Sequence, residues 1–228
     1  MKKIGLIGGL GPEPTIEYYK IINDHFKGSD EVRPRIIIYS LDVDELRRYF
    51  ESKDMDSVLR VLREGLTALD AAGASFGLIA ANTPHIVFDE LIEGSPLKLI
   101  SIVGETLKVI KELGLGKVGL LGTSFTMQSD LFQKELNPEG IEVYVPGTED
   151  QEYIQEKIYR ELSVGNFIDE TREGLLEIIK KLIDSHGIEA VILGCTELPL
   201  ILDREEFGIP FLNTTRIHAE SAIRMYLE

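Results

Sequence analysis

Two halves of the chain carry the same pattern at a displacement of 114 residues. The segment KIGLIG at 3–8 matches KVGLLG at 117–122, and 117 − 3 = 114. The same displacement relates four further pairs of positions: Gly73 and Gly187, Ala81 and Cys195, Gly94 and Gly208, and Pro96 and Pro210. A repeat that spans about half of the chain indicates two domains of similar fold, each large enough to form its own core.

Apolar runs rich in Ile, Val and Leu alternate along the whole chain with stretches of helical spacing. The apolar runs, which we expect to be strands, lie at 3–9, 34–40, 76–81, 98–102, 117–122, 141–145, 189–194 and 209–213. The expected helices lie at 14–27, 54–72, 84–93, 104–113, 126–136, 150–163, 168–186 and 215–227. Apolar strands that alternate with helices are typical of parallel sheets covered on both faces. The sequence therefore predicts an α/β fold with a four-stranded parallel sheet in each half.

The repeat also predicts where the domains begin and end. The last strand and helix, at about 208–228, correspond to the segment with which the chain leaves its first half. We therefore expect the end of the chain to return to the first domain. The predicted domains are 1–100 together with 208–228, and 101–207.

Composition and charge argue against several classes of protein. With 228 residues, of which 43% are hydrophobic, the chain can bury a substantial core. The formal net charge of −15 argues against a nucleic-acid partner, because phosphate binding needs a basic surface. The apolar runs are too short for a membrane span and the strand-like start does not fit a signal peptide, so we expect a cytoplasmic protein. One cysteine and four scattered histidines lack the spacing of a metal site, so no metal is expected.

Four loops follow expected strands and are candidates for ligand binding. They are GGLGPEPT after the first strand, ANTPH after the third, GTSFT after the fifth and GCTE after the seventh. In parallel α/β sheets, ligands bind beyond the carboxyl ends of the strands. The sequence therefore predicts that these loops surround a common cleft.

The first of these loops is rich in glycine. A dinucleotide-binding GxGxxG motif that began at Gly9 would need a glycine where this chain has Pro14, and no Walker lysine follows. In one interpretation the glycines have a purely structural role, which is to let the next helix begin close to the sheet. Alternatively, the backbone N–H groups at Gly9 and Leu10 face an anionic ligand.

The loops ANTPH and GTSFT combine helix-starting residues with possible substrate ligands. Asn82 and Thr83 precede a proline, which is typical of the start of a helix, but they can equally bind a substrate carboxylate. Thr123 and Thr126 likewise either begin a helix or bind carboxylate oxygens. His85 lies in the same turn as Asn82 and is expected to be structural.

Cys195 is the only cysteine, and it follows the seventh strand. A lone cysteine in such a position is often an inert, buried side chain. This one precedes Thr196 and Glu197, where we expect a short helix to begin, and helix-terminal amides would stabilise a thiolate. A thiolate so placed can act as a base or as a nucleophile.

Together the segments IGLIGGLGPEPTIEYY, AANTPH, LLGTSFTM, VILGCTELP and NTTRIHAE resemble the aspartate/glutamate racemase family, and its aspartate racemase branch in particular. The resemblance extends from Lys3 to about Glu220, and GCTEL after a strand is its most specific part. It implies two pseudo-symmetric Rossmann-like domains, an active site in the interdomain cleft, no cofactor and a homodimer. The implied partner is a small-molecule substrate, either an amino acid or a dicarboxylate.

The resemblance also implies a mechanism with two thiols. One thiolate removes the α-proton of the substrate, and the opposite thiol delivers a proton to the other face. Inversion needs proton donors on both sides of a planar intermediate, and without pyridoxal phosphate the protein alone must stabilise the developing charge. By resemblance the second thiol is Cys195, with Thr196 and Glu197 beside it. The first thiol belongs at Ala81, whose methyl group cannot transfer a proton; Thr83 is a possible substitute.

Other positions depart from the family pattern or align poorly. Arg47 and Arg48 lie near the place where aspartate racemases often hold the side-chain carboxylate of the substrate. Ser163 stands where the family often has a lysine of the second domain that helps to bind an acidic substrate. Asn213 stands where an aspartate is frequent. His218 keeps its place in the pattern, where it either supports a thiol or caps the last helix.

Three functional hypotheses follow from the missing thiol. The first is an amino-acid racemase that transfers protons through Cys195, with water or Thr83 on the other face. The second is a single-thiol decarboxylase or isomerase, as in the similar arylmalonate decarboxylases, which keep only the second cysteine. The third is a substrate-binding form that is disabled by a natural or engineered cysteine-to-alanine change at position 81.

Overall fold

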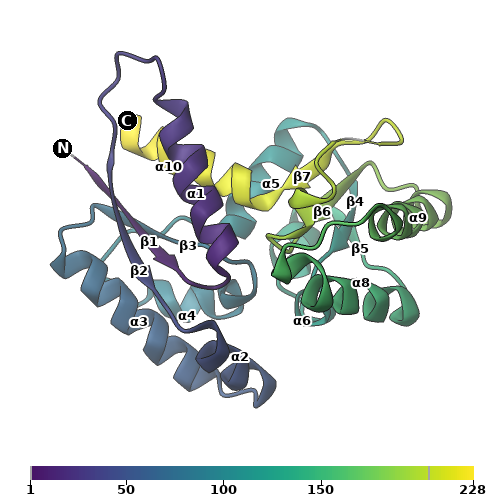
Figure 1. Cartoon of the computed structure of the whole chain (residues 1–228), viewed down its shortest axis with the longest axis horizontal. Helices are drawn as coiled ribbons and strands as arrows, with labels where there is room; N and C mark the ends of the chain where they lie inside the picture. The colour runs from purple at the N-terminus through teal and green to yellow at the C-terminus, as the bar shows by residue number, and fades with distance from the viewer. Residues whose placement is uncertain (1, 205) are drawn as a thin grey trace. The chain divides into compact units, whose positions relative to one another are not determined.

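The computed structural model describes residues 2–204 and 206–228, and the chain divides into two compact units. Unit 1 comprises Met1–Glu105 and Thr215–Glu228, and unit 2 comprises Thr106–Thr214. Figure 1 shows strands and helices alternating along the chain in both units. The α/β fold with parallel sheets is therefore confirmed.

Unit 1 contains a parallel sheet in the order β2-β1-β3. The three strands are β1 (Lys3–Gly8), β2 (Arg35–Ser40) and β3 (Phe76–Ile79). The helical segments that belong wholly or partly to this unit are α1 (Pro12–His25), α2 (Val43–Glu51), α3 (Met55–Ala71), η1 (Thr83–Val87), α4 (Phe88–Ile92), α5 (Ile102–Glu112) and α10 (Thr214–Leu227).

Alternate residues of β1 enter two different apolar clusters, one on each face of the sheet. Ile4 and Leu6 pack in a cluster with side chains of α1 and α10, which lie side by side in Figure 1. Ile7 packs in a second cluster with side chains of α3 and α4. Because helices cover both faces, β1 and β3 are almost completely buried, as their apolar sequences predict.

The fourth strand predicted for this sheet, at 98–102, is reduced to a single bridge. Leu99 pairs in parallel with Gly77, whose N–H donates to Lys98 O (2.9 Å) and whose carbonyl accepts from Ile100 N–H (3.1 Å). Helix α5 begins at Ile102, so the chain turns away before a longer strand can form. The prediction of four full strands in the first half is therefore wrong.

Unit 2 contains a four-stranded parallel sheet in the order β5-β4-β6-β7. Its strands are β4 (Lys117–Leu121), β5 (Glu142–Tyr144), β6 (Ala190–Leu193) and β7 (Phe211–Asn213). The remaining helical segments are α6 (Ser124–Gln128), α7 (Gln133–Leu136), η2 (Asn137–Glu139), α8 (Thr148–Arg160), η3 (Leu162–Val164), α9 (Asp169–His186) and η4 (Leu198–Leu200). Side chains of α8 and α9 pack with those of β6 in one apolar cluster, which includes Cys195.

The pairing of β7 differs from the predicted domain boundary. This strand pairs with β6, with Leu193 opposite Asn213, so it belongs to the sheet of unit 2. We expected residues 208–228 to join the first domain as one piece, but only the part from Thr215 onward is counted with unit 1. Backbone hydrogen bonding to β6 holds the strand in the second sheet.

Helix α2 was absent from the predicted elements, although the sequence carries a signal for it. Asp42 is its N-cap, and the side-chain carboxylate accepts hydrogen bonds from the N–H groups of Asp44 (2.9 Å) and Glu45 (3.3 Å). The helix buries only Leu46, so the apolar periodicity that revealed the other helices is weak here. Among residues 2–204 and 206–228, no helix has the length and apolar character that a membrane crossing needs.

Candidate functional site

The structure brings Cys195 and its two successors together at the carboxyl end of β6. The Cys195 thiol donates a hydrogen bond to Glu197 Oε2 (2.9 Å), and the Thr196 hydroxyl donates to the same oxygen (3.0 Å). The cysteine is buried, whereas Thr196 and Glu197 are half-buried. The three residues therefore form a small network in which one carboxylate accepts two hydrogen bonds.

This environment favours a neutral thiol. Burial raises the pKa of Cys195 well above its ordinary value, and the negative charge of Glu197 raises it further. Hydrogen bonds from the backbone at Glu197 and Thr196 act in the opposite direction, but they are the smaller causes. This environment is contrary to the expectation of a stabilised thiolate, and the short helix η4 begins at Leu198.

The hydroxyl groups after β4 interact with each other and with the start of a helix. Thr123 is the N-cap of α6; its hydroxyl accepts from Thr126 N–H (3.3 Å) and lies 3.1 Å from the Thr126 hydroxyl. Thr126 is fully buried. The contacts support the helix-capping interpretation of this pair, and a role in substrate binding stays a prediction.

The glycine-rich loop after β1 is occupied by its own side chains. Gly9 N–H donates to the Thr15 hydroxyl (2.9 Å), which in turn donates to Gly11 O (3.1 Å). Gly9 has a φ of +78°, and a Cβ there would lie 2.3 Å from Leu41 O, so only glycine fits. The N–H of Gly9 therefore serves the turn, contrary to its predicted role toward an anion. Leu10 is half-buried and packs against the apolar cluster that contains Ile7.

Ala81, Asn82 and Thr83 follow β3 in unit 1, as Cys195 follows β6 in unit 2. The repeat thus places position 81 and Cys195 at equivalent ends of equivalent strands. Ala81 and Asn82 are buried, and Thr83 is half-buried. Asn82 precedes η1, but its side chain makes no capping hydrogen bond.

His85 is connected to this loop through both nitrogens of its ring. Its Nδ1 lies 2.9 Å from Ala81 O, and its Nε2 accepts from Ile102 N–H (3.2 Å). Burial and, to a smaller extent, the neighbouring His218 lower the pKa of His85 from 6.5 to about 3. The ring is therefore neutral, and no feature of the sequence predicted its connection to Ala81.

His218 lies in the core of unit 1 and not at a helix end. Its Nδ1 accepts from the Tyr18 hydroxyl (2.7 Å), and its Nε2 lies 2.9 Å from Ile100 O. The residue is fully buried, and burial lowers the pKa of His218 from 6.5 to about 4. Both ring nitrogens have partners in unit 1 and neither caps α10, so the predicted role at the helix end is wrong, whereas a role in support of a thiol stays a prediction.

The charged residues considered for substrate binding are on the surface. Arg47 and Arg48 lie on the exposed part of α2, and Arg47 forms an ion pair with Asp44 (3.1 Å). Ser163, at the position of the family lysine, is exposed and donates to Tyr159 O (2.9 Å). In the described residues, no three His, Cys, Asp or Glu side chains form a group that could hold a metal ion.

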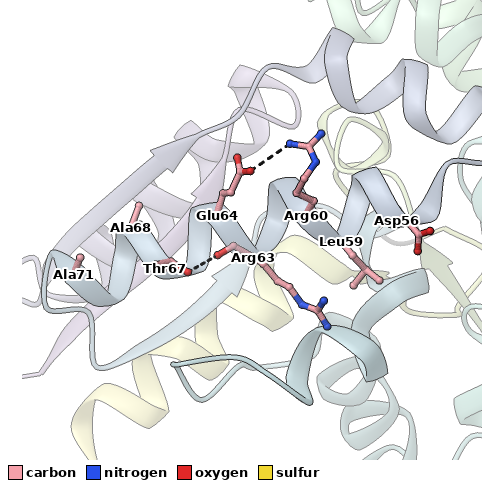
Figure 2. Close-up of a pocket in the computed structure, with 8 residues that line it drawn as sticks. All are labelled: Asp56, Leu59, Arg60, Arg63, Glu64, Thr67, Ala68 and Ala71. Carbon is pink, nitrogen blue, oxygen red and sulfur yellow. Dashed lines mark hydrogen bonds and ion pairs between the residues drawn. The ribbon is translucent and has the colours of Figure 1, made fainter.

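A groove of about 730 Å³ runs along the outer face of α3. Figure 2 shows Arg60 and Glu64 paired on one side of this helix, while Arg63 extends to the other side. Arg63 donates to Glu90 O (2.7 Å). None of the predicted site residues lines this groove, which we interpret as the solvent face of an amphipathic helix.

Comparison with known families and proteins agrees with the resemblance seen in the sequence. The family model described as Asp/Glu/Hydantoin racemase matches residues 7–222. The broad specificity amino-acid racemase of Bacillus subtilis is 26% identical over 231 residues, which cover 98% of each chain.

Solved structures show the same fold over the whole chain. An aspartate racemase homologue from Pyrococcus horikoshii is 37% identical, with a TM-score of 0.87 and full coverage of both chains. The aspartate racemase of Picrophilus torridus has a TM-score of 0.79 at 24% identity, over 99% of this chain and 94% of the other.

Proposed function

Because the chain belongs to the Asp/Glu/hydantoin racemase family, we propose that it is a cofactor-independent amino-acid racemase in which Cys195 exchanges the α-proton of the substrate. The observation that carries this proposal is the hydrogen bond from the Cys195 thiol to Glu197 (2.9 Å). The family resemblance further supports a homodimer in the cytoplasm.

The Cys195–Glu197 contact supplies a route for the proton. The thiol is neutral, so it must first lose its proton, and the Glu197 carboxylate is in position to accept it. The resulting thiolate takes the α-proton of the amino acid, which leaves a carbanion and restores the thiol. Return of a proton to the same face regenerates the starting enantiomer, whereas a proton from water on the other face completes inversion. The hydroxide that this leaves takes the proton held by Glu197, which restores the carboxylate.

Loss of the thiol tests this proposal directly. In deuterated water, we expect exchange of the α-proton of at least one enantiomer of a common amino acid, measured by proton NMR. Cys195→Ser is expected to slow this exchange at least about 100-fold, because a serine hydroxyl is a much weaker acid than a thiol. Ser163→Ala, at an exposed position, is the control and should keep the rate. The proposal fails if the unsubstituted protein exchanges none of the common amino acids.

Glu197→Gln separates the acidity of the thiol from catalysis. Loss of the negative charge should lower the pKa of Cys195, because that charge contributes to raising it. Since Cys195 is the only cysteine, alkylation by iodoacetamide at increasing pH reports this change directly. The α-proton exchange should nevertheless fall about 100-fold, because an amide cannot accept the thiol proton. Faster alkylation accompanied by unchanged exchange would remove Glu197 from the mechanism.

A single-thiol decarboxylase is the second candidate, and the neutral state of Cys195 favours it. Loss of CO₂ from a malonate-type acid produces a carbanion without a base, and one proton donor then completes the reaction. A thiol whose pKa is raised is such a donor, and the methyl group of Ala81 is then no disadvantage. Release of CO₂ from substituted malonates, with no α-proton exchange on amino acids, would establish this alternative.

A further inference from the structure

We propose that the free edge of β2 is the surface through which two copies of this chain associate. The β2 strands of the two copies pair in antiparallel orientation about a twofold axis at Ile38, so that one sheet continues through both copies. The inference rests on the homodimer of the proposed function, for which it names an interface, and it is tested without substrate.

The backbone of β2 pairs with another strand on one side only. In the order β2-β1-β3 this strand lies at an edge, and among residues 2–204 and 206–228 no strand other than β1 pairs with it. Leu41 N–H donates to Gly8 O (2.9 Å), so the backbone at Leu41 faces β1. In a parallel pair, every second residue of a strand bonds to the same neighbour. Ile36, Ile38 and Ser40 therefore direct their N–H and C=O groups to the open edge.

The side chains along this edge are apolar and uncharged. Ile38 is 41% exposed, and the run from Ile36 to Tyr39 contains no charged residue. Edge strands that stay unpaired are usually protected by charged side chains or by a covering segment. A run of isoleucines is instead typical of a strand that has neighbours on both sides.

The apolar surface continues from β2 to the start of α1. A Cβ atom at Gly8 would lie 2.5 Å from Thr15 and 3.3 Å from Ile38, so the edge strand lies beside the start of this helix. Ile16 and Tyr19 of α1 are half exposed. A second copy that pairs with β2 can therefore cover apolar side chains of α1 as well.

Opposite charges lie at the two ends of the edge. Arg33 and Arg35, at the start of β2, are exposed, and in the described part of the chain neither forms an ion pair. Asp42, just after the strand, is exposed and caps α2, but it pairs with no described cation. Antiparallel pairing brings Arg35 of each copy near Asp42 of the other, whereas parallel pairing would place Arg35 beside Arg35. The charges therefore favour a second copy in antiparallel orientation.

The limits of the strand determine the register. When Ile38 lies opposite Ile38 of the second copy, Ile36 lies opposite Ser40, and the residues of each pair exchange both hydrogen bonds. A shift by two residues toward the start of β2 would bring in Pro34, which has no N–H. A shift in the other direction would bring in Asp42, where the chain turns into α2. An axis at Ile38 therefore uses every residue that faces the edge.

A substitution at the axis tests the interface. Ile38→Lys places two ammonium groups beside each other at the axis and removes an apolar contact. Sedimentation equilibrium of the unsubstituted protein should show a dimer with a Kd below about 10 μM, and Ile38→Lys should raise this Kd at least about 100-fold. Ile92→Lys is the matched control, because Ile92 is 48% exposed in the same unit, and it should leave the Kd unchanged.

Cross-linking tests the register without a charged substitution. In the background Cys195→Ser, which has no thiol, a short bismaleimide should join two copies of Ile38→Cys. Ile36→Cys and Ser40→Cys should cross-link at least about tenfold more when mixed than when alone, because these positions face each other across the axis. Ile92→Cys is the control and should remain without cross-links.

The outcomes separate this interface from the proposed function. A monomer at about 100 μM would overturn the proposal, as would assemblies larger than a dimer, because pairing about a twofold axis is closed. A dimer that persists in Ile38→Lys, or equal cross-linking through Ile38→Cys and Ile92→Cys, would also overturn it. If Ile38→Lys does not fold, the cross-linking decides. A protein that dimerises through β2 but exchanges no α-proton would refute only the proposed function.

Discussion

Ala81→Cys is expected to increase the rate of racemisation about 1,000-fold, the middle of the range for a positioned acid or base. The family mechanism needs a proton donor on each face of the substrate carbon, and this chain offers one thiol, at Cys195. Ala81 lies at the end of β3, as Cys195 lies at the end of β6. Addition of a sulfur atom at position 81 restores the second thiol of the repeat. Circular dichroism of each enantiomer over time measures the conversion.

The control for this variant is Ala81→Ser. Serine adds a hydroxyl of similar size but of far weaker acidity, so it should give little gain in racemisation. The third variant, Ala81→Cys combined with Cys195→Ser, should lose the gain again. If Ala81→Cys leaves racemisation at the level of the unsubstituted protein, the site has diverged from the family reaction. A full gain from an inactive starting protein would instead identify the chain as a disabled racemase.

Acidification is expected to destabilise the protein by about 6 kcal/mol between pH 6.5 and pH 4, because His85 and His218 are buried in their neutral forms. Burial lowers the pKa of His85 to about 3 and that of His218 to about 4, from an ordinary value of 6.5. Between pH 6.5 and these lowered pKa values, the two histidines are protonated in the unfolded chain and neutral in the folded chain. Stability is complete above this pH and is lost as the pH falls, by about 1.4 kcal/mol per histidine and pH unit.

Urea denaturation at several values of pH measures this loss. Between pH 6 and pH 4.5, the free energy of unfolding should fall as the pH falls. The slope should correspond to an uptake of nearly two protons on unfolding. Ser163→Ala, at an exposed position with no titratable side chain, is the control and should keep the slope. A slope of less than one proton would contradict the neutral, buried state of the two histidines.

The positions of the strands could be predicted because burial on both faces leaves a continuous apolar run in the sequence. The repeat adds information that single strands lack, since β3 and β6 lie at positions related by 114 residues. The first sheet nevertheless lacks a full fourth strand, because pairing at Leu99 depends on where α5 begins. Helix α2 escaped prediction because it buries so little apolar surface, although Asp42 marks its start.

The residues of the candidate site were harder to interpret than to locate. Cys195 and Glu197 were both candidates for the site. The protonation of the Cys195 thiol depends on its burial and on its contact with Glu197, and neither can be read from the sequence. His218 was misinterpreted because its partner Tyr18 is 200 positions away in the chain. Gly9 had a structural and a ligand-binding interpretation, and the structural one prevails because a side chain six positions later takes up its N–H.

The return of the chain to unit 1 through α10 has a consequence for synthesis. Unit 2 is one continuous stretch, Thr106–Thr214, so all of its residues are available before α10 leaves the ribosome. Unit 1 starts first but cannot be completed until α10 emerges, because Ala219, Ala222 and Ile223 of α10 cover one face of its sheet. Domains generally fold as units during synthesis. The half of the protein that is made first is therefore the half that finishes folding last, and the apolar face that awaits α10 is exposed to chaperones until then.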